Sequence, residues 1–140
     1  FKVIGDREKL DADIVELIKV AEELTKENCD LTLTIALSYG GRRAITLAAK
    51  ELAYRACEGT IKLDEISEEA FELVLETHGV PNPDLVIRTS GEKRISNFLL
   101  WECAYSEFVF FDTLWPDFSS EHLTKAVQEY CNRERRFGAA

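Results

Sequence analysis

The sequence predicts an α/β fold, in which a mostly parallel sheet carries helices on both faces. Short segments rich in β-branched residues alternate along the chain with longer segments of helical periodicity. The apolar run at residues 85–87 is typical of an inner parallel strand covered on both faces. A polar loop follows this run from Arg88 onward. Because open α/β sheets bind ligands at the carboxyl ends of their strands, this loop is the first candidate site.

The elements are predicted in chain order from periodicity and turn signals. A strand at 1–4, a helix at 11–27, a strand at 31–37 and a helix ending near 56 come first. A helix follows at 66–78, with Ser67 as its N-cap and Gly79 as its stop. After the strand at 85–87, an apolar helix is expected to begin at Ser96, followed by a strand at 108–111. A rigid turn at 115–118 leads to a final helix capped by Ser119 or Ser120.

Composition limits the classes of protein to which the chain can belong. A length of 140 residues with 46% apolar residues allows one domain, residues 1–140, with a real core. The net charge of −9 argues against non-specific binding to nucleic acid or anionic membranes. The four cysteines form no Cys-x-x-Cys pair, which argues against zinc and favours a reducing cytoplasm, with Cys103 and Cys131 as core residues. No apolar run reaches the length of a transmembrane helix.

The loop after residue 87 brings Arg88 and Arg94 close in sequence to Ser96, where a helix N-terminus is expected. Arginine presents a planar fork that matches phosphate oxygens, and a helix N-terminus favours anions. These residues therefore predict a phosphate or diphosphate site. The alternative is that both arginines are ordinary surface residues paired with Glu92 and Asp84.

Three motifs carry a resemblance to a known family. They are Arg88-Thr89-Ser90-Gly91-Glu92-Lys93-Arg94-Ile95-Ser96-Asn97-Phe98, then Ala104-Tyr105-Ser106-Glu107-Phe108, then Leu114-Trp115-Pro116-Asp117-Phe118. Together they closely resemble the cis-prenyltransferases, and the bacterial undecaprenyl diphosphate synthases are the nearest match. The resemblance covers essentially the whole chain. Members of this family carry a further N-terminal section with a phosphate loop for the allylic substrate, so this chain is expected to be the C-terminal portion of such a domain.

The resemblance implies a reaction in which isopentenyl diphosphate units are condensed onto an allylic diphosphate, such as farnesyl diphosphate, to give a long polyprenyl diphosphate such as undecaprenyl diphosphate. It implies a Mg²⁺ cofactor, a homodimer, a cytoplasmic enzyme and a product that partitions to the membrane. No catalytic residue is assigned within this chain. Glu107 is expected to serve the magnesium ion, or else to form an ordinary interface salt bridge, and the expected substrate-binding residues are Arg88, Arg94, Ile95, Ser96, Arg136 and Gly138.

A second hypothesis comes from a different class of function. The chain could be a non-catalytic fragment or accessory subunit that binds a catalytic cis-prenyltransferase. The intact diphosphate motif argues against this hypothesis, and the lack of the allylic phosphate loop in these residues argues for it. In either case the isolated chain is expected to be inactive.

Overall fold

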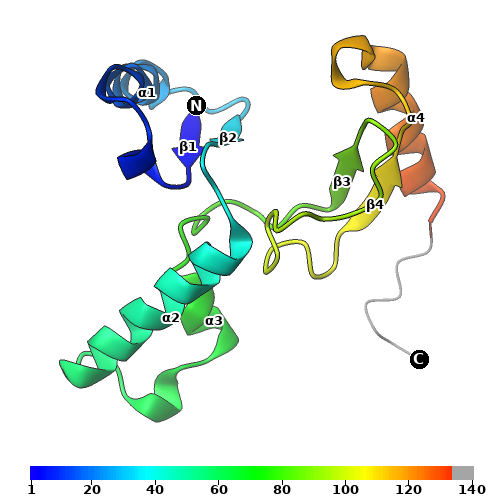
Figure 1. Cartoon of the computed structure of the whole chain (residues 1–140). Helices are drawn as coiled ribbons and strands as arrows, with labels where there is room; N and C mark the ends of the chain where they lie inside the picture. The colour runs from blue at the N-terminus through cyan, green and yellow to red at the C-terminus, as the bar shows by residue number, and fades with distance from the viewer. Residues whose placement is uncertain (134–140) are drawn as a thin grey trace. The chain divides into compact units, whose positions relative to one another are not determined.

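The computed structural model describes residues 1–133 of the chain, and Figure 1 shows their elements. The order is β1 (Lys2–Ile4), α1 (Ala12–Thr25), β2 (Thr34–Ala36), α2 (Gly41–Cys57), α3 (Glu68–Glu72), β3 (Leu85–Arg88), β4 (Glu107–Phe110) and α4 (Ser120–Cys131). Both strand pairs are parallel, which confirms the α/β class. The chain divides into two compact units, one up to Val80 and the other from Pro81 onward. The prediction of a single domain over residues 1–140 stays a prediction.

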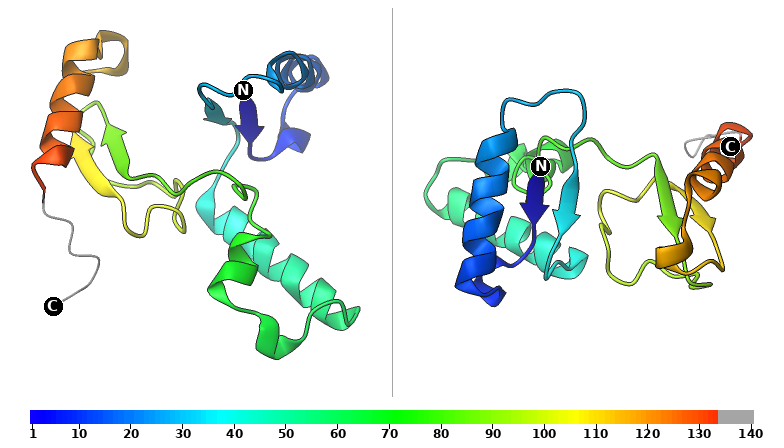
Figure 2. Two further views of the ribbon diagram at one scale, coloured as in Figure 1. Left: turned by 180° about the vertical axis from the view of Figure 1, so that it is seen from behind. Right: turned by 90° about the horizontal axis from the view of Figure 1, so that it is seen from above.

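The first unit begins with a β-α-β crossover. Strands β1 and β2 pair in parallel with Lys2 opposite Thr34 and Ile4 opposite Ala36. Parallel strands need a crossover of a dozen or more residues, and α1 supplies it. Figure 2 shows α1 beside the two strands, and α1 buries Ile18 to 5% exposure.

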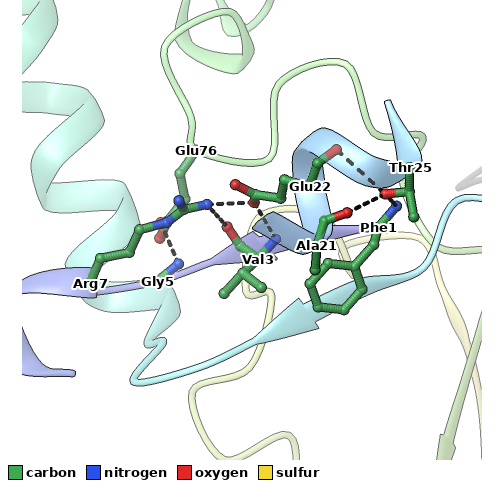
Figure 3. Close-up of polar contacts among 8 residues, drawn as sticks. All are labelled: Phe1, Val3, Gly5, Arg7, Ala21, Glu22, Thr25 and Glu76. Atoms are coloured by element: carbon green, nitrogen blue, oxygen red, sulfur yellow. Dashed lines mark hydrogen bonds and ion pairs between the residues drawn. The ribbon is translucent and has the colours of Figure 1, made fainter. Parts of the chain in front are cut away.

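Two carboxylates close the outer side of β1 (Figure 3). The amide of Val3 donates to Oε1 of Glu22 on α1 at 3.0 Å, and the amide of Gly5 donates to Oε2 of Glu76 at 2.9 Å. Arg7 donates to the carbonyl of Val3 at 3.0 Å and to the same Glu22 oxygen at 2.6 Å. The amide of Val3 in β1 and the amide of Gly5 just after β1 are therefore both paired with side chains instead of with a further strand.

The longest helix, α2, packs through small residues at helical spacing. Ala44, Ala48 and Leu52 are all buried, and α2 contacts α3. Ser67 caps α3 by accepting the amide of Ala70 at 3.2 Å, as predicted. The helix predicted over 66–78 is wrong beyond residue 72, because the amides of residues 74, 75, 78 and 80 bond three residues back in successive turns.

The second unit is built on β3 and β4. They pair in parallel with Leu85 opposite Glu107 and Arg88 opposite Phe110. Helix α4 packs on β4, and the core lies where Val109 and Ala126 are buried to 2% and 0% exposure. All residues of β3 stay partly exposed, so the expectation of a strand covered on both faces is wrong for the described residues.

The apolar helix predicted after Ser96 is not formed. Ser96, Asn97 and Leu99 have φ values of 49°, 64° and 41°, which lie in the left-handed region. A residue in that region cannot continue a right-handed helix, so the crossover from β3 to β4 consists of turns. Ser96 is therefore not a helix N-cap, and no helix dipole contributes to the predicted anion site.

The buried faces were predicted too broadly. Cys103 is buried, as expected, whereas Cys131 is exposed. Several apolar residues expected to face inward have large exposed fractions: Leu17 64%, Leu24 78%, Leu123 49% and Val127 45%. Among the described residues, no helix combines the length and the apolar character that crossing a membrane requires.

Candidate anion-binding site

The side chains of Arg88, Arg94 and Ser96 converge at the carboxyl end of β3. Nη1 of Arg88 donates to Oγ of Ser96 at 3.0 Å, and Nε of Arg94 donates to the same oxygen at 3.2 Å. Nη1 of Arg88 also donates to the carbonyl of Arg94. Because one hydroxyl oxygen accepts from both guanidinium groups, the two positive charges lie within reach of one small anion.

The backbone of the loop is held against the segment that follows β4. The amide of Phe111 donates to the carbonyl of Arg88 at 2.9 Å, which extends the strand pairing by one bond. The amide of Ser90 then donates to the carbonyl of Thr113 at 2.8 Å, and that of Gly91 donates to the carbonyl of Phe111 at 2.9 Å. These three bonds fix where Arg88 leaves the strand.

A pocket of about 230 Å³ lies between the loop and the strands. Its lining combines the polar groups with apolar side chains: Val86, Ile87, Arg88, Arg94, Ile95, Ser96, Phe98, Phe108 and Phe110. The rings of Phe108 and Phe110 stack with centroids 6.1 Å apart. Pockets for drug-sized ligands measure roughly 300–1,000 Å³. This pocket therefore suits a short ligand with a charged end and an apolar end, and it is too small for a long hydrocarbon chain.

The alternative prediction was that the two arginines are surface residues paired with acidic neighbours. Part of it is also observed, because Nη1 of Arg94 forms an ion pair with Glu92. The side chain of Arg94 is 61% exposed and that of Glu92 is 39% exposed. Exposed ion pairs contribute only about 0–1 kcal/mol. An anion held by two guanidinium groups can therefore compete with Glu92 for Arg94.

Glu107 lies at the opposite end of the strand pair from Arg88. The register places Glu107 opposite Leu85, three residues before Arg88, which corresponds to about 10 Å along a strand. Its Oε2 accepts from Nη1 of Arg133 at 2.6 Å, and Arg133 also pairs with Glu129. The contacts with Glu107 and then Glu129 raise the pKa of Arg133. Within this chain, Glu107 is therefore the partner of an arginine.

This arrangement does not by itself provide a magnesium site. Among residues 1–133 no three histidine, cysteine, aspartate or glutamate side chains gather where they could hold a metal. Magnesium in proteins usually takes one or two carboxylates together with phosphate oxygens and water. Glu107 offers a single carboxylate that already neutralises Arg133, and it does not line the pocket. The magnesium cofactor stays a prediction.

Of the other predicted residues, Ile95 lines the pocket, whereas Arg136 and Gly138 lie outside the described residues. The sequence reasoning missed the aromatic lining. It interpreted residues 108–111 only as a strand and Phe98 only as part of a buried helix. The period of two in a strand places Phe108 and Phe110 on one face, and this alternation was the signal that could have identified them.

Comparison with known proteins supplies the class. The family model described as "Putative undecaprenyl diphosphate synthase" matches residues 1–138. The chain therefore belongs to this prenyltransferase family. It is 53% identical to an isoprenyl transferase of Zymomonas mobilis, matching 98% of this chain and 55% of that protein. It is 50% identical to a ditrans,polycis-undecaprenyl-diphosphate synthase of Micrococcus luteus, again over 98% of this chain and 55% of that protein.

Solved structures show the same relationship. The chain matches lavandulyl diphosphate synthase from Lavandula x intermedia, in complex with dimethylallyl diphosphate, with a TM-score of 0.96 and 39% identity over 99% of this chain and 59% of that one. It matches a probable undecaprenyl diphosphate synthase from Campylobacter jejuni with a TM-score of 0.83 and 38% identity over 97% of this chain and 61% of that one. The chain thus spans little more than half the length of the curated relatives reported above.

Proposed function

We propose that the pocket beside β3 binds isopentenyl diphosphate in a cis-prenyltransferase reaction. The observation that carries this proposal is the convergence of Arg88 and Arg94 on the hydroxyl of Ser96. Two guanidinium groups suit a diphosphate, which offers several oxygens to their planar forks. The names of the relatives, isoprenyl transferase and undecaprenyl diphosphate synthase, support a prenyl diphosphate as the ligand.

The lining supports the five-carbon substrate over a longer one. The phenylalanine rings and Ile95 provide an apolar wall next to the arginines, where a short isoprenoid tail would lie. In the proposed reaction, the double bond of isopentenyl diphosphate forms a carbon–carbon bond to C1 of the allylic substrate. The C1–O bond of the allylic diphosphate breaks, and a proton leaves the new chain. The role of this chain's residues is to hold the nucleophilic substrate in position, which reduces the entropic part of the barrier.

Other parts of the proposal rest on family membership alone. They are the use of farnesyl diphosphate as the allylic substrate, a product such as undecaprenyl diphosphate that partitions to the membrane, a homodimer completed by Arg136 and Gly138, the magnesium ion with Glu107, and a cytoplasmic location. No step of the reaction is assigned here to the metal. The growing chain is proposed to lie outside the pocket beside β3, which measures only about 230 Å³.

The test is calorimetric titration of the chain with isopentenyl diphosphate and with inorganic pyrophosphate, each with and without Mg²⁺. Arg94→Ala is expected to weaken binding roughly tenfold or more, because hydrogen bonds to charged groups contribute about 1.5–3 kcal/mol. Arg55→Ala is the matched control, since Arg55 is an exposed arginine of α2 whose partner is Glu51. Equal affinity of Arg94→Ala and the unmodified chain would refute the assignment.

A turnover assay separates the enzyme from the accessory-subunit alternative. Isopentenyl transfer is measured for the chain alone and for the chain mixed with a full-length relative. We expect no turnover by the chain alone. Stimulation of the relative by a chain that binds no isopentenyl diphosphate would favour the accessory role, whereas robust turnover by the chain alone would show that it contains a complete site.

A further inference from the structure

His122 lies in the first turn of α4 and has hydrogen-bond partners on both ring nitrogens. The amide of Ser119 donates to Nδ1 at 3.1 Å, and Nε2 lies 3.1 Å from Oγ1 of Thr113. A backbone amide can only donate, so Nδ1 is the acceptor and carries no proton. Because Nδ1 accepts, Nε2 is the nitrogen that donates, to the hydroxyl of Thr113.

Aromatic contacts fix the plane of the same ring. The ring of Phe111 meets His122 edge to face with centroids 5.6 Å apart, and that of Phe118 stacks on it at 5.5 Å. The two rings also contact each other at 5.7 Å. Oγ of Ser119 also lies 2.9 Å from Nδ1. The position of His122 is thus determined by two rings and its rotation by three hydrogen bonds.

Two of the residues that His122 contacts, Thr113 and Phe111, also hold the loop of the candidate site. Thr113 receives the Nε2 hydrogen bond on its hydroxyl and the amide of Ser90 on its carbonyl. Phe111 receives the His122 ring on its side chain and the amide of Gly91 on its carbonyl. We propose that His122 is a positioning residue for the diphosphate pocket, because it locks the segment 111–113 to which the loop after Arg88 is bonded.

The backbone conformation of the loop explains why the segment 111–113 must be held in place. Ser90 has a φ of 69°, a conformation that residues with a side chain rarely adopt, and Gly91 has a φ of 70°. A non-glycine residue persists in that region only when its surroundings hold it there. The hydrogen bond from the amide of Ser90 to the carbonyl of Thr113 is one such restraint, and Ser90 lies two residues from Arg88. When Thr113 moves, the direction in which Arg88 leaves β3 changes with it.

This inference rests on the proposed function for its ligand, but its primary test needs no ligand. Amide hydrogen exchange at Ser90 and Gly91 is measured by NMR on the free chain. Thr113→Val removes the hydroxyl that His122 reaches while keeping the carbonyl that Ser90 uses. His122→Asn offers an oxygen in place of Nδ1, so it can still accept the amide of Ser119, but it is too short to reach Thr113.

In both variants, the amide hydrogens of Ser90 and Gly91 are expected to exchange about fivefold faster, which is the change that the loss of one typical hydrogen bond would give. The double variant is expected to be no faster than His122→Asn alone, because the contact that Thr113→Val removes is one of those that His122→Asn already removes. Thr124→Val is the matched control, since the hydroxyl of Thr124 bonds only within α4, to the carbonyl of Ser120. Unchanged exchange in both single variants, with α4 intact by circular dichroism, would overturn the proposal.

Titration with inorganic pyrophosphate then separates this inference from the proposed function. If faster exchange is accompanied by a several-fold loss of pyrophosphate affinity, both the positioning role of His122 and the proposed function are supported. If the unmodified chain binds neither pyrophosphate nor isopentenyl diphosphate, the proposed function fails, while the exchange data still decide whether His122 positions the loop. If pyrophosphate affinity is unchanged in variants whose exchange is faster, the positioning role does not extend to the pocket and the proposal is refuted.

Discussion

Nη1 of Arg88 lies 3.0 Å from Oγ of Ser96, although the two residues are eight positions apart in the sequence. The loop between them folds back so that the residue ending β3 meets the residue that begins the second run of turns in the crossover. Since Arg94 donates to the same hydroxyl, Ser96 is the point at which the two arginines are brought together. The geometry of the candidate site therefore depends on one small uncharged side chain.

Ser96→Ala tests this dependence directly. Without the shared acceptor, the two guanidinium groups lose their common restraint, and pyrophosphate affinity is expected to fall by roughly tenfold. Calorimetric titration measures the change. Ser120→Ala, at the exposed start of α4, is the control and is expected to bind as the unmodified chain does. Equal affinities for Ser96→Ala and Ser120→Ala would show that the arginines do not need Ser96.

Gly5→Ala is expected to destabilise the first unit severely. Gly5 has a φ of 113°, and a Cβ atom placed on it would lie 2.1 Å from the carbonyl oxygen of Leu37. Both atoms belong to rigid parts of the chain, so the backbone after β1 or after β2 must move. We expect a loss of about 3 kcal/mol or more in the free energy of unfolding, at the upper end of single substitutions. Urea unfolding followed by circular dichroism measures it.

Gly59→Ala is the control for this experiment. Gly59 also has a left-handed φ, 72°, but a Cβ atom there would have nothing within 4 Å. Gly59→Ala should cost only the strain of placing a residue with a Cβ atom in the left-handed region, about 1–2 kcal/mol. If Gly5→Ala were no more costly than Gly59→Ala, the close approach of Gly5 to Leu37 would not exist in solution.

Because of Glu22, we expect the free energy of unfolding to fall in acid. The hydrogen bond from Arg7 lowers the pKa of Glu22, and the bond from the amide of Val3 adds to this effect. A carboxyl whose pKa is lower in the folded state stabilises above its unfolded pKa, and this contribution is lost as the pH falls through the folded pKa. Glu22→Gln keeps an oxygen for Val3 but loses the charge. Its free energy of unfolding should therefore be about 0.5–1 kcal/mol lower at pH 7.

The difference between the unmodified chain and Glu22→Gln is expected to shrink as the pH falls below the ordinary pKa of glutamate and through the lowered pKa of folded Glu22. Denaturant unfolding at pH 7, 5 and 3 follows it. Glu16→Gln is the control, because Glu16 forms only an exposed pair with Lys19 at 3.6 Å. A pH-independent difference for Glu22→Gln would mean that its pKa is not lowered by folding.

The sequence predicted the elements whose periodicity is local. The strands near 1–4 and 85–87 and the helices near 11–27 and ending near 56 are all present, with ends shifted by a few residues. The helix after Ser96 failed because its apolar pattern carries no signal for the left-handed backbone of Ser96, Asn97 and Leu99. Apolar content indicates that a segment prefers burial, but it does not decide between a helix and a series of turns.

The same difference between local and non-local information explains which residues of the candidate site could be predicted from the sequence. Arg88, Arg94 and Ser96 were predicted to act together because nine residues contain them all, and the structure brings them together. Alternation along residues 108–110 indicates that Phe108 and Phe110 share a face, but only the register of β3 with β4 places Phe110 opposite Arg88 and so puts that face beside the arginines. The same register separates Glu107 from Arg88, which no local pattern in the sequence reveals.

The pair of carboxylates on β1 has a consequence for how the chain behaves in concentrated solution. The outward amides of a strand at the edge of a sheet are a template on which another molecule can add a strand and start an aggregate. In this chain the amides of Val3 and Gly5 already donate to Glu22 and Glu76, so an incoming strand must first displace both side chains. Replacing both glutamates with alanine would expose the template and favour fibrous precipitation.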